Sequence, residues 1–145
     1  MFKGRRVAVV IPAFNVAPQI AGVIGGLPDF VDDVIVVDDA ARDASAEIVA
    51  GLRDPRVTLA RHAVNQGVGA AMVTGFRLAL ERGADVVVKM DGDGQMDPAQ
   101  LPALLEPIVS EACAYAKGNR FLHVDALRAM PKTRLVGSFV LTFLT

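Results

Sequence analysis

The sequence predicts an α/β fold with a mostly parallel sheet that is covered by helices on both faces. Short apolar runs rich in Val and Ile alternate along the chain with longer segments whose apolar residues recur at helical spacing. The apolar runs contain few polar positions, as expected for strands that are buried on both faces. Parallel neighbours need long crossover connections, and the intervening helical segments supply them.

The first three elements are a strand, a helix and a strand. Residues 6–11 are an apolar run that ends at a polar loop beginning with Pro12, so we predict a strand followed by a loop. Residues 18–27 carry apolar side chains at three- and four-residue intervals, which predicts a helix. Residues 34–37 form a second buried run, closed by Asp38 and Asp39.

The middle of the chain repeats this pattern. Asp43 is a suitable cap for a helix that runs to about residue 53. Residues 57–60 predict a short third strand. The stretch 65–69, which contains two glycines, then opens a long helix that ends at Gly83.

Two more strands and one more helix follow. Residues 86–90 begin with three valines and predict a buried strand. Residues 97–109 predict a helix. Pro98 suits its first turn, where backbone N–H groups have no hydrogen-bond partner within the helix and the missing N–H of proline is not needed. Residues 114–117 predict a further strand.

Composition excludes several classes of protein. The chain has 145 residues, enough for one domain with a sizeable core, and 52% of them are hydrophobic. Fifteen basic and sixteen acidic residues nearly cancel, so no overall field recruits nucleic acid. Cys113 is the only cysteine and can form no internal disulfide. No apolar run is long enough to span a bilayer, and the amino-terminal run is interpreted as a strand rather than a signal peptide.

An acidic turn follows the strand predicted at residues 86–90. Asp91 and Asp93 are separated by Gly92, and Gly94 and Gln95 come next. A parallel strand that ends in two carboxylates directs them into the crevice where α/β proteins bind ligands. Close carboxylates repel one another unless a cation or a shared proton compensates. Oxygen ligands on a tight turn suit Mg2+ or Mn2+, which also bind substrate phosphates, so we interpret the turn as a divalent metal site that holds a diphosphate.

The acidic turn has two other interpretations. Asp-Gly-Asp-Gly is favourable turn chemistry by itself and binds nothing in many proteins. An EF-hand loop starting at Asp91 is excluded, because Met96 stands where Gly is needed and Pro102 stands where a bidentate Glu is needed.

Polar clusters after three of the predicted strands are expected to line one crevice. They are residues 12–15, the pair of aspartates at 38 and 39, and the acidic turn. Asp39 is placed to accept a hydrogen bond from a nucleobase N–H or a ribose hydroxyl, although a strand-to-helix turn or cap would use the same residue.

The glycines at 67 and 69 and the histidines have weaker interpretations. Gly67 and Gly69 resemble a phosphate-binding turn at a helix start, but they also suit close packing of a helix on a sheet. A dinucleotide fingerprint is excluded, because Met72 stands at the third glycine position. His62 and His123 have no metal-ligand spacing and are interpreted as surface or loop residues.

Taken together, these segments resemble the family 2 glycosyltransferases, which adopt the GT-A fold, a Rossmann-like α/β fold. Four motifs carry the resemblance in order. They are Val9-Val10-Ile11-Pro12-Ala13-Phe14-Asn15, Val36-Val37-Asp38-Asp39-Ala40-Ala41-Arg42-Asp43, Asn65-Gln66-Gly67-Val68-Gly69-Ala70-Ala71 and Asp91-Gly92-Asp93-Gly94-Gln95. The second departs from the family pattern, because Ala40-Ala41 replaces the usual Gly-Ser.

The carboxyl-terminal part resembles the branch of dolichyl- and polyprenyl-phosphate sugar synthases. Lys117-Gly118-Asn119-Arg120-Phe121 and the later Met130-Pro131-x-x-Arg134-x-x-Gly137 carry that resemblance. It implies a role for each matching residue. The residues bordering the nucleotide would be Pro12, Ala13, Phe14, Asn15, Asp39 and Gly67. The metal and the diphosphate would be bound by Asp91, Asp93 and Gln95, with Asp93 the more direct metal ligand. The acceptor or its phosphate would be bound by Arg120 and Arg134.

The resemblance implies an inverting glycosyltransferase that uses Mg2+ or Mn2+. The donor would be a nucleoside-diphosphate sugar of the GDP-mannose or UDP-glucose type, and the acceptor polyprenyl or dolichyl phosphate at a membrane surface. Such a protein is expected in the cytoplasm, peripheral on the cytoplasmic face of the membrane. The alternatives are transfer to a saccharide hydroxyl, a non-catalytic nucleotide-sugar-binding module, and a different nucleotide enzyme such as a nucleotidyltransferase.

The resemblance also predicts how the chain is divided. Residues 1–118 would form the nucleotide-sugar-binding core, and residues 119–145 the start of an acceptor-side segment. Because residues 135–145 are apolar and stop without a polar tail, we expect the chain to be the front portion of a longer protein, or this segment to pack on a membrane or a second copy.

Overall fold

The computed structural model describes residues 1–118 of the chain. The chain divides into two compact units, and the first, Met1–Ala114, contains all of the elements described here. In chain order they are β1 (Val7–Ala13), α1 (Ala17–Gly25), β2 (Asp33–Asp38), α2 (Ser45–Gly51), β3 (Val57–Arg61), α3 (Val68–Glu81), β4 (Val86–Lys89), the 3-10 turn η1 (Pro98–Gln100) and α4 (Leu101–Val109). The predicted alternation of strands and helices is confirmed through α4.

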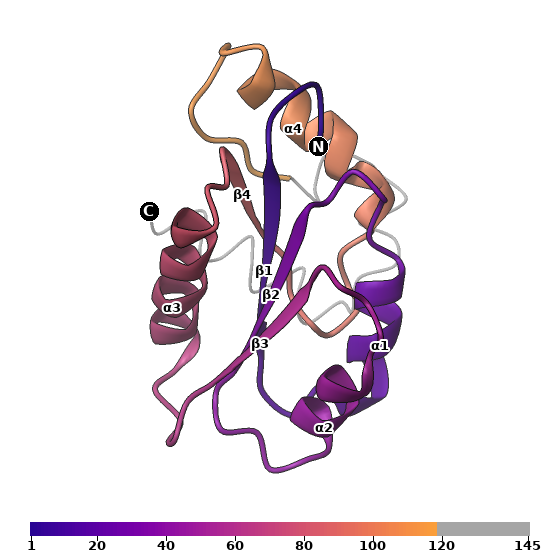
Figure 1. Ribbon diagram of the computed structural model, residues 1–145, viewed down its shortest axis with the longest axis vertical. Helices are drawn as coiled ribbons and strands as arrows, with labels where there is room; N and C mark the ends of the chain where they lie inside the picture. Colours follow the sequence, from indigo (N-terminus) through magenta and orange to yellow (C-terminus); the bar gives the residue numbers. More distant parts are fainter. Residues whose placement is uncertain (119–145) are drawn as a thin grey trace, which may run out of the picture. The chain divides into compact units, whose positions relative to one another are not determined.

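The strands form a four-stranded sheet in the order β3-β2-β1-β4, and every neighbouring pair is parallel. The chain therefore begins in the middle of the sheet, moves outward to β3, and returns through α3 to the other side of β1 (Figure 1). Ligands of open α/β sheets bind at the carboxyl ends of the strands where the strand order reverses. Here that point is the carboxyl end of β1.

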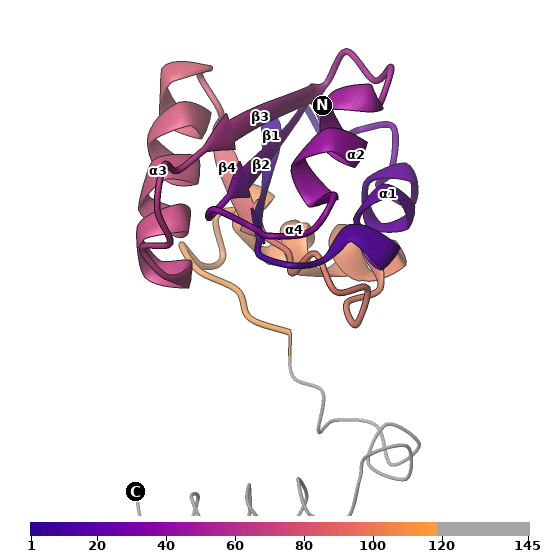
Figure 2. The ribbon, with the colours of Figure 1, turned by 90° about the horizontal axis from the view of Figure 1, so that it is seen from below.

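Helices cover both faces of this sheet, as predicted. Figures 1 and 2 show α3 on one face and α1 and α2 on the other. Successive side chains of β1 point to opposite faces: Val9 and Ile11 pack in the core with α1 and α4, whereas Ala8 and Val10 pack in the core with α3. All four of these side chains are fully buried, so β1 is the hydrophobic centre of the unit.

Strand β1 extends further than the sequence predicts. It was expected to stop at residue 11, but Pro12 and Ala13 continue it and pair with Val37 and Asp38 of β2. Val10 faces β4, since its carbonyl accepts the Met90 N–H, and Pro12, two residues later, faces the same side. Because β4 ends at Lys89, the N–H that Pro12 lacks would have had no strand partner there.

The strand predicted at residues 114–117 is not formed, and the structure assigns no regular element to this stretch. The segment Ala-Tyr-Ala-Lys contains no β-branched residue, and Ala and Lys are poor strand formers without a partner ladder to fix them. The prediction was wrong because four residues with so little strand preference form a strand only where a neighbouring strand supplies a hydrogen-bonding partner.

Close packing of α3 on the sheet depends on a glycine that the sequence analysis did not single out. A Cβ atom added at Gly67 or Gly69 meets nothing within 4 Å, so close packing is not their role. A Cβ atom at Gly75 would lie 2.2 Å from Val10 Cγ1. Val10 is fully buried in β1, so neither the strand nor the helix can move aside without disturbing the core.

We therefore predict that Gly75→Ala lowers the free energy of unfolding by about 1 to 2 kcal/mol, because overpacking outweighs the gain in helix propensity. The matched control is Gly22→Ala in α1, where the added Cβ meets nothing within 4 Å. It should be neutral or stabilise by up to about 1 kcal/mol. Urea titrations of the three proteins measure both effects, and a Gly75→Ala protein as stable as the Gly22→Ala protein would contradict the packing argument.

Candidate functional site

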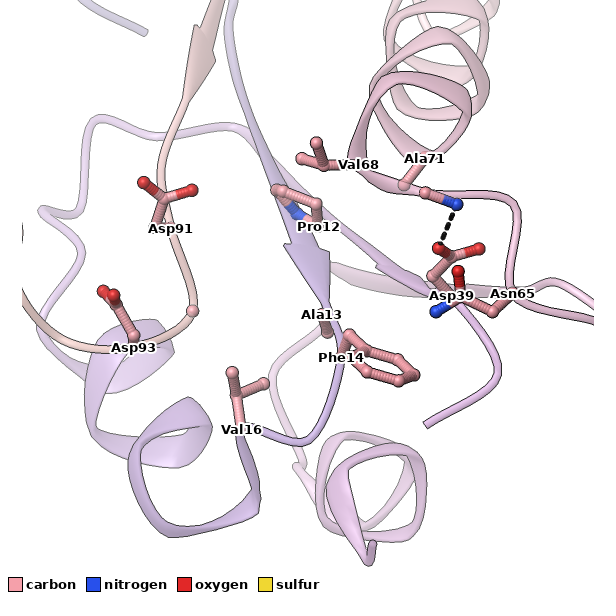
Figure 3. Close-up of a pocket in the computed structure, with 12 residues that line it drawn as sticks. Pro12, Ala13, Phe14, Val16, Asp39, Asn65, Val68, Ala71, Asp91 and Asp93 are labelled. Carbon is pink, nitrogen blue, oxygen red and sulfur yellow. Dashed lines mark hydrogen bonds between the residues drawn. The ribbon is translucent and has the colours of Figure 1, made fainter. Parts of the chain in front are cut away.

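A cavity of about 450 Å³ lies at the carboxyl edge of the sheet. It is bounded by the ends of β1 and β2, the start of α3 and the turn after β4 (Figure 3). Its lining residues are Pro12, Ala13, Phe14, Val16, Asp39, Asn65, Gly67, Val68, Ala71, Asp91, Gly92 and Asp93. All three clusters that were expected to converge contribute to this one cavity.

The acidic turn forms one side of the cavity, and Figure 3 shows Asp91 and Asp93 on the same loop, across Pro12 and Ala13 from Asp39. Asp93 is exposed, and its Oδ1 accepts the Gln95 N–H at 3.0 Å. Asp91 is partly buried and pairs with Lys89, whose Nζ lies 2.6 Å from Asp91 Oδ1. The turn thus presents two carboxylates, one of which already binds a cationic side chain.

The backbone of the acidic turn is held against α1. Gly92 is buried, and a Cβ atom there would come within 3.2 Å of both Val16 Cγ2 and Ile20 Cδ1. Gly94 adopts a φ of 76°, which side-chain-bearing residues rarely take. The two glycines therefore set the course of the turn on which the aspartates lie.

The loop after β1 forms the floor of the cavity. Phe14 is 45% exposed there, so its ring offers a flat apolar surface to a ligand. The next residue, Asn15, has a φ of 56° and its Oδ1 accepts the Arg42 N–H at 2.9 Å. Asn15 therefore joins two loops of the site and does not line the cavity itself.

Asp43 fixes the position of this loop relative to α2. Its Oδ2 accepts the Ala17 N–H at 2.9 Å, and its Oδ1 accepts the Ser45 N–H at 3.0 Å. The Ser45 hydroxyl also donates to Asp43, and this hydrogen bond is the main reason that the pKa of Asp43 lies below its usual value. Asp43 was predicted to cap α2, but the residue at the N-cap is Ala44. From one position earlier, Asp43 orders the starts of both α1 and α2.

Asp39 lies on the opposite side of the cavity and is almost completely buried, with 4% of its surface exposed. Its Oδ1 accepts hydrogen bonds from His62 Nδ1 at 2.7 Å and from the Gln66 N–H at 2.9 Å. Its Oδ2 accepts the Gly67 N–H at 2.7 Å, the bond drawn in Figure 3. Since a carboxylate has about four acceptor positions, one position on Oδ2 stays free of these donors.

These contacts explain the charge state of Asp39. Burial alone raises the pKa of a carboxyl group, but the hydrogen bonds from Gln66, His62 and Gly67 favour the ionised form and outweigh burial. The pKa of Asp39 therefore lies below its usual value. The positive φ of Gly67, 87°, lets its N–H reach this carboxylate, which gives this glycine a conformational role.

His62 is a residue whose role the sequence analysis missed. It lies in the loop after β3, which fits the expected surface or loop position, but it is not a surface residue, because only 9% of its side chain is exposed. While Nδ1 bonds to Asp39, Nε2 lies 3.0 Å from Thr74 Oγ1 on α3. The ring therefore connects Asp39 to α3 through its two nitrogen atoms. No local sequence signal reveals the pair, because His62 and Asp39 lie 23 positions apart.

The predicted site residues fall into three groups. Seven of them line the cavity: Pro12, Ala13, Phe14, Asp39, Gly67, Asp91 and Asp93. Asn15 and Gln95 lie beside the site without lining it. Arg120 and Arg134, together with the apolar segment 135–145 and its expected contact with a second copy, lie outside the described residues. Within residues 1–118, no group of three or more His, Cys, Asp or Glu side chains could hold a metal ion by itself.

Comparisons with known proteins agree with the fold. The model of the family described as "Glycosyl transferase family 2" matches residues 8–144. The UDP-N-acetylglucosamine--dolichyl-phosphate N-acetylglucosaminyltransferase of Methanococcus voltae is 32% identical over 152 residues, which cover 94% of this chain and 61% of the relative. The undecaprenyl-phosphate mannosyltransferase of Micrococcus luteus is 41% identical over 107 residues, which cover 71% of this chain and 44% of the relative.

A solved structure shares the fold. The glucosyl-3-phosphoglycerate synthase of Mycobacterium tuberculosis, in complex with Mn2+, UDP and glucosyl-3-phosphoglycerate, matches with a TM-score of 0.57 and 27% identity, covering 74% of this chain and 40% of the synthase chain. The chain thus spans about half the length of the proteins that it resembles, 61% of one relative and 44% of another.

The hydrogen bonds to Asp39 predict a specific pH dependence of stability. Because the pKa is lowered in the folded state, the contribution of Asp39 is complete above the pKa of an unfolded aspartate, about 3.9, and is lost as the pH falls through the folded value. Wild type should exceed Asp39→Asn in unfolding free energy by a constant margin above about pH 5, and that margin should shrink at lower pH. Urea titrations between about pH 3 and pH 6 measure it, and a margin that grows on acidification would refute the assignment.

Proposed function

Because the chain belongs to glycosyl transferase family 2, we propose that it is the donor-binding part of an enzyme that moves a sugar from a nucleoside-diphosphate sugar to polyprenyl or dolichyl phosphate. Residues 1–118 form the nucleotide-sugar-binding core in this proposal, and residues 119–145 begin the acceptor side. The acceptor class is supported by the relatives, two of which are named as dolichyl-phosphate and undecaprenyl-phosphate sugar transferases.

One observation carries the donor assignment: Asp39, Phe14 and the acidic turn, from distant parts of the chain, line a single cavity. Its two sides differ in chemistry. On one side, the exposed Phe14 ring and the free acceptor position of Asp39 suit a base or ribose. On the other side, Asp91 and Asp93 suit a cation and the diphosphate that the cation neutralises. A nucleoside diphosphate matches this division, because it has a base and ribose at one end and a diphosphate at the other.

The acidic turn fits a divalent metal ion in its donor set. It offers carboxylate oxygens on a backbone fixed by two glycines, and these are ligands that Mg2+ and Mn2+ prefer. Two carboxylates leave most of a six-ligand shell to water and phosphate oxygens. When bound, the metal supplies positive charge to the departing nucleoside diphosphate.

The proposed reaction needs little acid–base chemistry from the protein. An oxygen of the acceptor phosphate forms a bond to the anomeric carbon while the bond from that carbon to the donor diphosphate breaks, and the electron pair leaves with the nucleoside diphosphate. Attack from the opposite face inverts the configuration at the anomeric carbon. Since the phosphate is already anionic, no side chain has to remove a proton from it. The residues of this chain act by binding and orienting the donor.

In this proposal the lipid acceptor brings the enzyme to a membrane surface. Within the residues that the structure describes, no helix has the length and apolar character needed to cross a bilayer. The proposal places the core at the cytoplasmic face of the membrane, with Arg120 and Arg134 as the residues that meet the acceptor phosphate.

The first test of this function is the metal dependence of nucleotide binding. Asp93→Asn should weaken the binding of UDP or GDP in the presence of Mn2+ by at least about tenfold, because the more exposed carboxylate of the turn is lost. The matched control is Asp97→Asn, which removes the same charge from the same loop and keeps an acceptor for the Ala99 N–H, 2.9 Å away. Calorimetry should find the control within about twofold of wild type; equal affinities of all three proteins would exclude the metal–diphosphate assignment.

The second test concerns the acceptor and uses radiolabelled nucleotide sugars with undecaprenyl phosphate in detergent. We expect label to move into the organic phase in a Mn2+-dependent manner. A parallel reaction with 3-phosphoglycerate, the acceptor type implied by the name of the mycobacterial synthase, should give no labelled product. Transfer to 3-phosphoglycerate but not to the lipid would contradict the acceptor assignment and leave the donor site in place.

A further inference from the structure

Lys89 forms an ion pair with the acidic turn, and no step of the proposed reaction uses it. It is the last residue of β4 and pairs in register with Val10 of β1, so the sheet fixes its backbone. Its Nζ lies 2.6 Å from Asp91 Oδ1, and 40% of its side chain is exposed, against 36% for Asp91. No other hydrogen bond or ion pair of Asp91 occurs among residues 1–118. Lys89 is thus the counterion of a cavity-lining carboxylate.

The charges around this pair are strongly unequal. The residues that line the cavity include three aspartates, at 39, 91 and 93, and no lysine or arginine. Asp39 already accepts hydrogen bonds from His62, Gln66 and Gly67. Lys89 therefore compensates negative charge in the acidic turn and not that of Asp39 on the opposite side of the cavity. Asp93 is bonded through Oδ1 to the Gln95 N–H alone among the described residues. Among the described residues, the acidic turn thus carries two carboxylates, and Lys89 forms an ion pair with only one of them, Asp91.

A lysine in this position opposes a metal ion in two ways. Asp91 Oδ1 cannot bind a metal ion and keep its full interaction with the ammonium group, so metal binding through Asp91 weakens or breaks the ion pair. The ammonium group also repels a dication a few ångströms away, by an amount that solvent reduces but does not remove at this partial exposure. A diphosphate reverses the balance, because its negative charges attract both cations.

We infer that Lys89 is a positioning residue that holds Asp91 while the site is empty and makes metal binding depend on the nucleotide. This inference rests on the proposed metal–diphosphate site. Without nucleotide, the lysine competes with the metal for Asp91, so the metal alone binds weakly. With the nucleotide, the released ammonium group lies beside the diphosphate and metal and nucleotide bind together. By linkage, the factor by which nucleotide strengthens metal binding equals the factor by which metal strengthens nucleotide binding.

Removal of the lysine charge tests this inference. Mn2+ titrations followed by electron paramagnetic resonance, with and without UDP or GDP, give the metal affinity in both states. Lys89→Met should bind Mn2+ alone about three- to tenfold more tightly than wild type, because a competitor and a repulsive charge are gone. The same variant should show a smaller strengthening of Mn2+ binding by the nucleotide. Lys89→Arg, which keeps the charge, should restore the wild-type behaviour.

A second lysine provides the matched control. Lys3 also forms an ion pair with a carboxylate, Glu106, and both side chains are about half exposed, at 56% and 51%. Lys3→Met removes the same charge and a similar surface ion pair at a distance from the cavity, and it should leave Mn2+ affinity unchanged. If Lys89→Met binds Mn2+ alone no more tightly than Lys3→Met while wild type shows nucleotide-dependent Mn2+ binding, the role of Lys89 is refuted and the proposed function stands. If wild type binds no Mn2+ in either state, the proposed metal site itself is refuted.

Discussion

Burial of β1 on all sides is the constraint on which the rest of the structure depends. Val7 to Ile11 have no exposed surface, and both faces and both edges of the strand are occupied. Because the side chains of a strand alternate between faces, one strand anchors both hydrophobic cores of the unit. Its carboxyl end is then fixed between the ends of β2 and β4, which brings Asp39 and Asp91 to the same cavity as Pro12.

The two sides of the cavity are stabilised in different ways, and this difference matters for function. The Asp39 side is fixed before any ligand arrives, since buried hydrogen bonds tie the carboxylate to His62 and to the start of α3. The acidic turn is fixed in its backbone by Gly92 and Gly94 but leaves its carboxylates accessible. A rigid wall for the nucleoside and an accessible pair of acids for exchangeable cations suit a site that binds and releases a charged donor in each cycle.

Much of this arrangement could be predicted from the sequence because the evidence is local. The alternation of strands and helices is predicted by the valine runs, the helical spacing of apolar residues and Gly83. The convergence of the site at one edge of the sheet is predicted by the polar residues at the strand ends. Contacts between distant residues could not be predicted in this way. The bond of His62 to Asp39, the contact of Gly75 with Val10 and the extension of β1 through Pro12 each depend on which elements become neighbours. The strand expected at 114–117 failed for the related reason that a short run has no strand character without a partner.

The central claim is that the carboxylates after β4 bind a divalent cation which in turn holds the diphosphate of an activated sugar. Crystals soaked with Mn2+ and UDP or GDP, with data collected at the manganese absorption edge, test it most directly. The account predicts an anomalous peak in coordination contact with Asp93 and with the phosphate oxygens, and the base or ribose beside Asp39. A manganese peak and a nucleotide found elsewhere, with the Asp93 carboxylate free in solvent, would contradict it.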